Sequence, residues 1–269
     1  MNDLVRLEET DTRIVKLVLN RPEAMNAINV PMRKQLAVEL ERLAYDDNIR
    51  VVIITGAEKE GRRKAFSSGD DLKDPGFKME SPTAVLDYYK VTDEMMRLYD
   101  FIDNYPKPVI AMVNGIALGG GVELALSCDF IFAGENAVFG FPEVNLGFIP
   151  GWGGTQRLTR RVGEANAKRL IFTGETITAR EAKDISLVDV VTAEEDLWNT
   201  TLEFARRITG KSPLMITAAK KSIERGMECS MQSGLLYEML GMMMSLKTED
   251  MKEGITAFLE KRKPIFTGK

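Results

Sequence analysis

Two glutamates and a run of three glycines are the residues of this chain whose types and spacing could do chemistry. Residues 114–123 read Asn-Gly-Ile-Ala-Leu-Gly-Gly-Gly-Val-Glu, and Glu143 follows in Phe-Gly-Phe-Pro-Glu. Three glycines lose much conformational entropy on folding, so they indicate that backbone must approach another group closely. The residues after them are good helix formers. The free N–H groups at the start of such a helix can hold a ligand oxygen that gains negative charge during a reaction.

Glu123 is expected to point at the same spot. It lies three residues past Gly120, which puts it on the same helical face one turn along. Helical side chains lean toward the N-terminus, so its carboxylate is directed back at the glycines. Taken alone, Glu123 also fits a solvated or capping glutamate, and Glu143 after Pro142 also fits a turn carboxylate.

The chain of 269 residues contains no His. This excludes Ser-His-Asp and Cys-His mechanisms and the His ligands of most catalytic zinc sites. Glu, Asp, Lys, Tyr and Cys remain as proton carriers. The simplest interpretation is therefore a site with two carboxylates near a helix start that stabilises an anion, and we expect no metal.

Composition narrows the class of protein. With 44% hydrophobic and 28% charged residues, the chain suits one large globular domain, or one domain with a helical appendage. The net charge of −4 does not favour nucleic-acid or anionic-membrane partners. Cys128 and Cys229 have the contexts of reduced thiols in a cytoplasmic protein. We see neither a signal-peptide pattern nor an apolar run that could span a bilayer.

Hydrophobic periodicity predicts strands that alternate with helices. Helices are expected over 31–44, over 82–105 and after the glycine run, and strands at 14–19, 51–55, 109–113, 129–133 and 137–139. This alternation indicates an α/β domain. Beyond about residue 151 the pattern is nearly all helical, apart from 187–191. We expect residues 193–269 to form a helical appendage.

A second small-residue loop, Ser67-Ser68-Gly69-Asp70-Asp71, follows the strand at 51–55 after a polar segment. It could place another backbone N–H at a ligand. Most loops of small polar residues have no catalytic role, so this signal is weak by itself. Paired with the glycine run it matters more, because two N–H donors from different loops make an oxyanion hole.

At this point the chain resembles the crotonase (enoyl-CoA hydratase/isomerase) superfamily over essentially its whole length. Several motifs in the right order carry the resemblance: Asn20-Arg21-Pro22 with Asn26-Ala27, residues 65–73, residues 114–123, Phe139–Glu143, Leu146-Gly147, residues 150–158, and Glu253-Gly254 through Phe258 to Lys263. The resemblance implies an α/β spiral of ββα units over residues 1–192, which holds the active site. It also implies a C-terminal helical region over 193–269 and assembly as a homotrimer or as a homohexamer built from two trimers.

The resemblance also implies a site. The backbone N–H groups of Asp70 and Gly120 would form the oxyanion hole, and Glu123 and Glu143 would hold a water. The substrate would be an acyl-CoA thioester, with coenzyme A as part of the substrate and no permanently bound cofactor. Beside Asp70 and Gly120, the implied substrate contacts are Ala65, Phe66, Ser68, Asp71, Leu72, Lys73, Phe141 and Trp152, together with Phe258 and Lys261, often from a neighbouring subunit.

The implied reaction is hydration of a 2-trans-enoyl-CoA to the 3-hydroxyacyl-CoA in cytoplasmic fatty-acid metabolism, as in β-oxidation. Three positions depart from the family pattern: Asp70 stands where a small apolar residue is usual, and Phe141 and Trp152 are bulky. Because of these aromatic residues, two alternative functions remain: an isomerase, or a hydratase or hydrolase of a cyclic acyl-CoA. An RNA-binding family member is a further alternative, which the −4 charge disfavours.

Overall fold

Two β-sheets organise the protein, for which a computed structural model describes residues 3–74 and 85–269. The larger sheet has the spatial order β1 (Val5–Asp11), β2 (Ile14–Leu19), β3 (Val51–Gly56), β5 (Val109–Val113), β7 (Phe130–Gly134) and β10 (Val190–Thr192). Its strands pair in parallel, except that β1 is antiparallel to β2. The smaller sheet has the order β4 (Ala65–Ser67), β6 (Ile116–Leu118), β8 (Val138–Gly140) and β9 (Thr176–Thr178), with β8 and β9 antiparallel.

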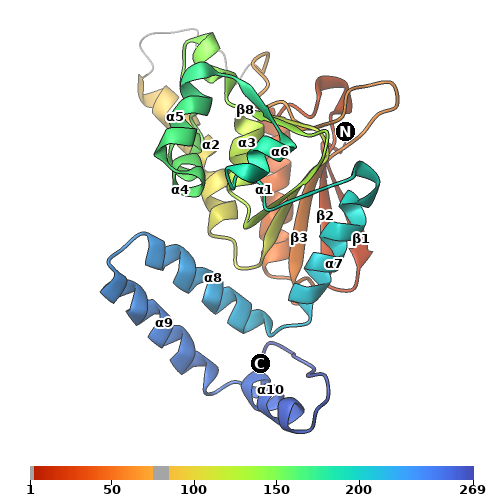
Figure 1. Ribbon diagram of the computed structural model, residues 1–269, viewed down its shortest axis with the longest axis vertical. Coiled ribbons are helices and arrows are strands. Elements are labelled where there is room, and N and C mark those ends of the chain that lie inside the picture. The colour runs from red at the N-terminus through yellow and green to blue at the C-terminus, as the bar shows by residue number, and fades with distance from the viewer. Residues whose placement is uncertain (1–2, 75–84) are drawn as a thin grey trace.

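The large sheet is buried on both faces, which explains the uninterrupted apolar runs of its central strands. Along β3, Val51 and Ile53 point to a cluster that includes α7 (Leu197–Thr209). Val52 and Ile54 point to the main core with α1 (Val30–Ala44), α2 (Val85–Asp103) and α3 (Gly120–Leu126). The sheet is therefore a rigid middle layer, and α3 lies on its main-core side (Figure 1).

Local sequence explains where α1 starts and which side it buries. The Asn29 side chain accepts a hydrogen bond from the Met32 amide at 2.9 Å, and a proline stands in the first turn. Met32, Leu36, Leu40 and Leu43 then recur at helical spacing and are buried. Arg33 is buried on the same helix.

Shorter helices and the C-terminal helices complete the chain. The short helices and helical turns are η1 (Pro22–Ala24), η3 (Pro142–Leu146), η4 (Gly154–Leu158), α4 (Thr159–Val162), α5 (Glu164–Thr173), α6 (Ala179–Asp184) and η5 (Glu194–Asp196). The last helices, α8 (Pro213–Met227), α9 (Met231–Ser245) and α10 (Glu249–Leu259), extend away from the sheets (Figure 1). No helix within residues 3–74 and 85–269 is both long enough and apolar enough to cross a membrane.

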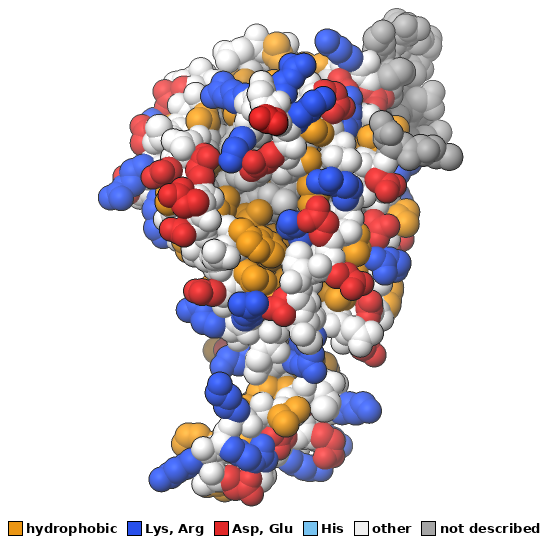
Figure 2. Space-filling view, turned by 90° about the vertical axis from the view of Figure 1, so that its right-hand side faces the viewer, with side chains coloured by type: hydrophobic (Ala, Val, Ile, Leu, Met, Phe, Trp, Pro, Cys, Tyr) orange, Lys and Arg blue, Asp and Glu red, His pale blue; other side chains and the backbone are white. Residues whose placement is uncertain are grey.

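The helix α9 carries large hydrophobic side chains that are exposed in the single chain: Met231, Leu235, Leu236, Tyr237, Met239, Leu240, Met242, Met243 and Met244. About half or more of most of these side chains is open to solvent. Elsewhere, Lys and Arg are interspersed with Asp and Glu over the face in Figure 2, with no single basic stripe on that face.

The α/β class and the C-terminal helical region are confirmed. The predicted strands at 14–19 and 109–113 match β2 and β5, and the others shift by about one residue, except that β10 begins later than predicted. Strands β1, β4, β6 and β9 were missed, because three of them have only three residues and β1 carries charges at an edge. Of the helix expected over 82–105, residues 82–84 lie outside the described residues. The division at residue 193 stays a prediction, and α7 packs on the large sheet through Leu197, Leu202 and Ala205.

Candidate active site

The glycine run places the start of α3 against the Asp70 loop. Gly119 precedes the helix with φ +49°, a conformation that favours glycine, and its amide donates to the Gly140 carbonyl at 2.9 Å. A Cβ built on Gly120 would lie 3.4 Å from the Asp70 nitrogen. The amides of Asp70 and Gly120 donate no hydrogen bond to any other described residue. Two backbone donors from different elements are therefore available at one spot.

The Asn20-Arg21-Pro22 and Asn26-Ala27 motifs hold the Asp70 loop in place. The Ile28 amide donates to the Gly69 carbonyl at 2.8 Å, and the Asp71 amide donates to the Ile28 carbonyl at 3.0 Å. The buried Asn26 side chain donates to the Ala65 carbonyl at 2.7 Å. Arg21 pairs with Asp71 at 2.9 Å. These contacts fix the loop backbone without using the Asp70 N–H.

Glu123 is buried on the first turn of α3. Its Oε1 accepts hydrogen bonds from the amides of Trp152 and Gly154, both at 2.7 Å. Burial raises the pKa of Glu123 to about 8, and the charges of Glu143 and Asp70 add to this, against the two amide donors.

Glu143 reaches the same place from η3. A Cβ built on Gly119 would lie 2.9 Å from Glu143 Oε1. Glu143 Oε2 is buried and has no hydrogen-bond partner among the described residues. Burial, together with the smaller effect of the Asp70 charge, raises the pKa of Glu143 to about 7. Both carboxyl groups therefore lie near the start of α3, and burial raises the pKa of each.

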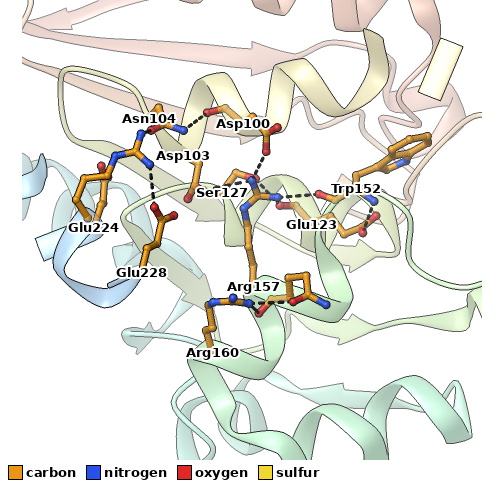
Figure 3. A network of polar contacts seen from close by, with 12 residues as sticks. Asp100, Asp103, Asn104, Glu123, Ser127, Trp152, Arg157, Arg160, Glu224 and Glu228 are labelled. Atoms are coloured by element: carbon orange, nitrogen blue, oxygen red, sulfur yellow. Dashed lines mark hydrogen bonds and ion pairs between the residues drawn. The ribbon is translucent and has the colours of Figure 1, made fainter. Parts of the chain in front are cut away.

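An ion-paired arginine fixes the loop that contacts Glu123. Arg157 donates to the Trp152 carbonyl at 2.9 Å and pairs with Asp100 at 2.8 Å and Asp103 at 3.3 Å (Figure 3). Since both aspartates lie on α2, this contact ties the loop to a helix of the main core. The Trp152 amide is thereby held where it meets Glu123.

Sequence and structure comparisons decide the family. The enoyl-CoA hydratase/isomerase family profile matches residues 9–269. The chain is 41% identical to the 2,3-dehydroadipyl-CoA hydratase of Escherichia coli, over 96% of each chain. It is 39% identical to the short-chain-enoyl-CoA hydratase of Clostridium acetobutylicum, over 95% of this chain and 94% of the other. A crystal structure of enoyl-CoA hydratase from Bacillus anthracis superimposes with a TM-score of 0.92 at 36% identity, over 99% of this chain and 100% of the other.

The chain belongs to the enoyl-CoA hydratase/isomerase family. The expected crotonase resemblance and the expectation of an enzyme are confirmed. Family membership covers the sheets and the C-terminal helices alike.

The other predicted site residues of this family member differ in how far they are buried. Ala65 and Phe66 are buried in β4, and the Ser68 hydroxyl donates to the Ala24 carbonyl at 3.4 Å. Phe141 is buried, with its ring 3.0 Å from a Cβ built on Gly154. Two further predicted contacts, Leu72 and Lys73, are solvent-exposed near the loop.

Phe258 and Lys261 do not reach this site within one chain. Phe258 is 83% exposed on α10, and Lys261 is exposed just beyond it. Figure 1 shows α10 at the far end of the molecule from α3. Their predicted contact with the substrate requires a neighbouring subunit and stays a prediction.

Arg33 is a site residue that was missed from the sequence. Its Nη2 lies 2.5 Å from Asp70 Oδ1, and its guanidinium carbon lies 5.8 Å from the centre of the Trp152 ring. A signal was present: Arg33 shares one face of α1 with Leu36, Leu40 and Leu43. A charge on a core-facing side of a helix needs a buried partner.

We expect the stability of the protein to report the raised pKa of Glu123. Since the folded state binds the Glu123 proton more tightly than the unfolded state, its stabilising contribution is present below pH 4.5 and is lost as pH rises toward 8. Glu123→Gln carries no charge and keeps an oxygen that can accept from Trp152 and Gly154. The Tm of the variant minus that of wild type should therefore increase between pH 5 and pH 9. A difference that is constant with pH would contradict this.

Proposed function

We propose that the protein adds water to a 2-trans-enoyl-CoA thioester and forms the 3-hydroxyacyl-CoA. One observation carries the proposal: two buried carboxyl groups with raised pKa values stand beside two amides that donate to no described residue. Relatives about 40% identical are named as hydratases, which agrees with this reaction.

The oxyanion hole would act on the thioester carbonyl. When water attacks Cβ of the conjugated thioester, negative charge moves to the carbonyl oxygen of an enolate. The amides of Asp70 and Gly120 would donate to that oxygen, and losing one such donor costs about 3–4 kcal/mol in comparable sites. Because these donors are backbone groups of fixed loops, they need no reorganisation as charge develops.

The two glutamates would handle the water. Burial raises the pKa of both glutamates, and two nearby carboxyl groups rarely both ionise, so the proposed mechanism uses one ionised and one protonated member. The ionised member would take a proton from water as its oxygen bonds to Cβ, and the protonated member would give its proton to Cα. The net addition is one OH and one H across the double bond, and the pair ends with the same number of protons.

Substrate contacts follow from the same site. The segment Ala65, Phe66 and Ser68 would contact the coenzyme A moiety through backbone groups, because the Ala65 and Phe66 side chains are buried, and Leu72 and Lys73 would lie at its exposed end. Phe258 and Lys261 would come from a neighbouring subunit. No cofactor is required, since the thioester supplies the electron-withdrawing group.

A substrate panel tests the proposed function. Straight-chain 2-trans-enoyl-CoA esters of increasing length and a cyclic enoyl-CoA are incubated with the protein, and loss of the conjugated thioester absorbance is followed. We expect turnover of at least one straight-chain ester. Faster turnover of the cyclic ester would favour the alternative suggested by Phe141 and Trp152, while movement of the double bond without gain of water would indicate an isomerase.

We also propose a homotrimer or homohexamer. The exposed apolar side chains of α9 are expected to be covered by another copy of the chain, because apolar surfaces of this extent mark interaction sites. Sedimentation at micromolar concentration should give three or six times the chain mass of 30.1 kDa. Leu240→Glu should lower that mass, and Lys211→Glu, an exposed change outside α9, should not. A wild-type monomer would contradict the assembly.

A further inference from the structure

A third carboxylate lies in the proposed site. Asp70 offers its N–H to the oxyanion hole, yet its own Oδ2 would lie 2.9 Å from a Cβ built on Gly120. The carboxylate and the hole are therefore close neighbours. A negative charge there opposes the charge that an enolate gains, so an acidic side chain at this position needs compensation.

Arg33 supplies that compensation. Its Nη2 lies 2.5 Å from Asp70 Oδ1, and the two side chains are only 7% and 10% exposed. The other carboxylate oxygen accepts from the Trp152 indole N–H. The Trp152 ring also stacks with Tyr99, with ring centres 6.3 Å apart. Donors from α1 and from the Trp152 loop thus hold both oxygens of one buried carboxylate.

We propose that Arg33 is a positioning residue for the reaction. It holds the Asp70 carboxylate against Trp152 and neutralises it, so that the Asp70 N–H serves the enolate while the Asp70 charge does not oppose it. This rests on the proposed function. It also accounts for an aspartate at a position that small apolar residues usually occupy in the family.

A double-mutant cycle separates this role from a structural one. The variants are Arg33→Met, Asp70→Asn and the double variant, with Lys34→Met as the matched control. Lys34 is the next residue of α1, and its ion pair with Glu94 is exposed. At a pH where Asp70 is ionised, we expect Arg33→Met to lower kcat roughly 100-fold, as an uncompensated charge a few ångströms away implies. The double variant should recover to within about threefold of Asp70→Asn, because the opposing charge is gone. Lys34→Met should match wild type.

The pH dependence gives a second readout. Among the described residues, the ionisable groups facing Asp70 are Arg33 from α1, Tyr99 from α2, Glu123 from α3 and Glu143 from η3. The glutamates titrate in both Arg33→Met and the double variant, and only Arg33→Met keeps the Asp70 carboxyl group. The ratio of the two kcat values therefore reports the ionisation of Asp70, both directly and through its effect on the pKa of the glutamates. Without Arg33, burial keeps Asp70 protonated at low pH, and the ratio should grow as pH rises and Asp70 ionises. If Arg33→Met lowered kcat only by damaging the structure, the ratio of the two kcat values would not change with pH.

Two results would overturn the proposal: near wild-type kcat for folded Arg33→Met, or a double variant that is folded and no better than Arg33→Met. If Arg33→Met does not fold, the same double-mutant cycle is measured with Arg33→Gln, which keeps a hydrogen-bond donor for Asp70. The same two results for Arg33→Gln would overturn the proposal. Failure of the proposed function looks different, since wild type would then hydrate no enoyl-CoA and the cycle would have no starting activity.

Discussion

Replacing Glu123 or Glu143 with Gln should lower kcat for the proposed enoyl-CoA hydration by about 10²–10⁴-fold in each case, the usual contribution of a general acid or base. Binding of the CoA ester should change little, because Gln fills the same space. The glutamine oxygen at position 123 can still accept from the amides of Trp152 and Gly154. Steady-state kinetics on the best ester of the panel, with calorimetric titration of the product, separates kcat from binding.

Glu135→Gln is the matched control for these variants. Glu135 is exposed in the turn between β7 and β8, and the same chemical change there should leave kcat unchanged. If either site variant retained near wild-type kcat while Glu135→Gln did the same, the mechanism with two glutamates would be wrong for this protein.

A Cβ at position 120 should damage catalysis without removing any side-chain group. In Gly120→Ala the new carbon would come within 2.9 Å of Asp70 Oδ2 and 3.4 Å of the Asp70 nitrogen, where the carbonyl oxygen of the substrate is proposed to bind. Gly120→Pro also deletes the N–H donor, and proline is well tolerated at the first position of a helix. We expect a loss of at least about 100-fold in kcat for the proline variant, the effect of one missing oxyanion donor.

Asp70→Ala and Gly210→Ala serve as comparisons for Gly120. Asp70→Ala should be mild, because only the backbone of that residue is proposed to act, and Gly210→Ala should be neutral, since a Cβ there meets nothing closer than 3.7 Å. Circular dichroism and Tm establish that each variant is folded before rates are compared. An inactive Asp70→Ala beside a folded and active Gly120→Pro would refute the oxyanion assignment.

The position of the candidate site along the chain could be predicted from local sequence. A glycine run before good helix formers predicts a helix start, and the three-residue spacing from Gly120 predicts that Glu123 faces it; both features are local and depend on helix geometry alone. The absence of His left Glu, Asp, Lys, Tyr and Cys as possible proton carriers, and the two glutamates near a helix start were the simplest choice among them. The ordered motifs then indicated the family, which the comparisons confirm.

Glu143 could be singled out from the sequence but not placed at the site by its spacing. Its position follows from the register of the small sheet, where Leu118 pairs with Gly140 and brings the start of η3 beside Gly119. Strand β6 has only three residues and produces no periodic signal, so its pairing with β8 could not be predicted, although β8 itself was predicted.

Tertiary structure alone decided the electrostatics of the site. The raised pKa values of Glu123 and Glu143 come first from burial, which depends on every element packed around them. The contact of Arg33 with Asp70 joins a helix and a loop 37 residues apart in sequence. Local sequence determines helix starts and the faces of helices, because these depend on neighbouring residues. Desolvation and ion pairing between distant segments depend on how the whole chain packs, so they became visible only in the folded protein.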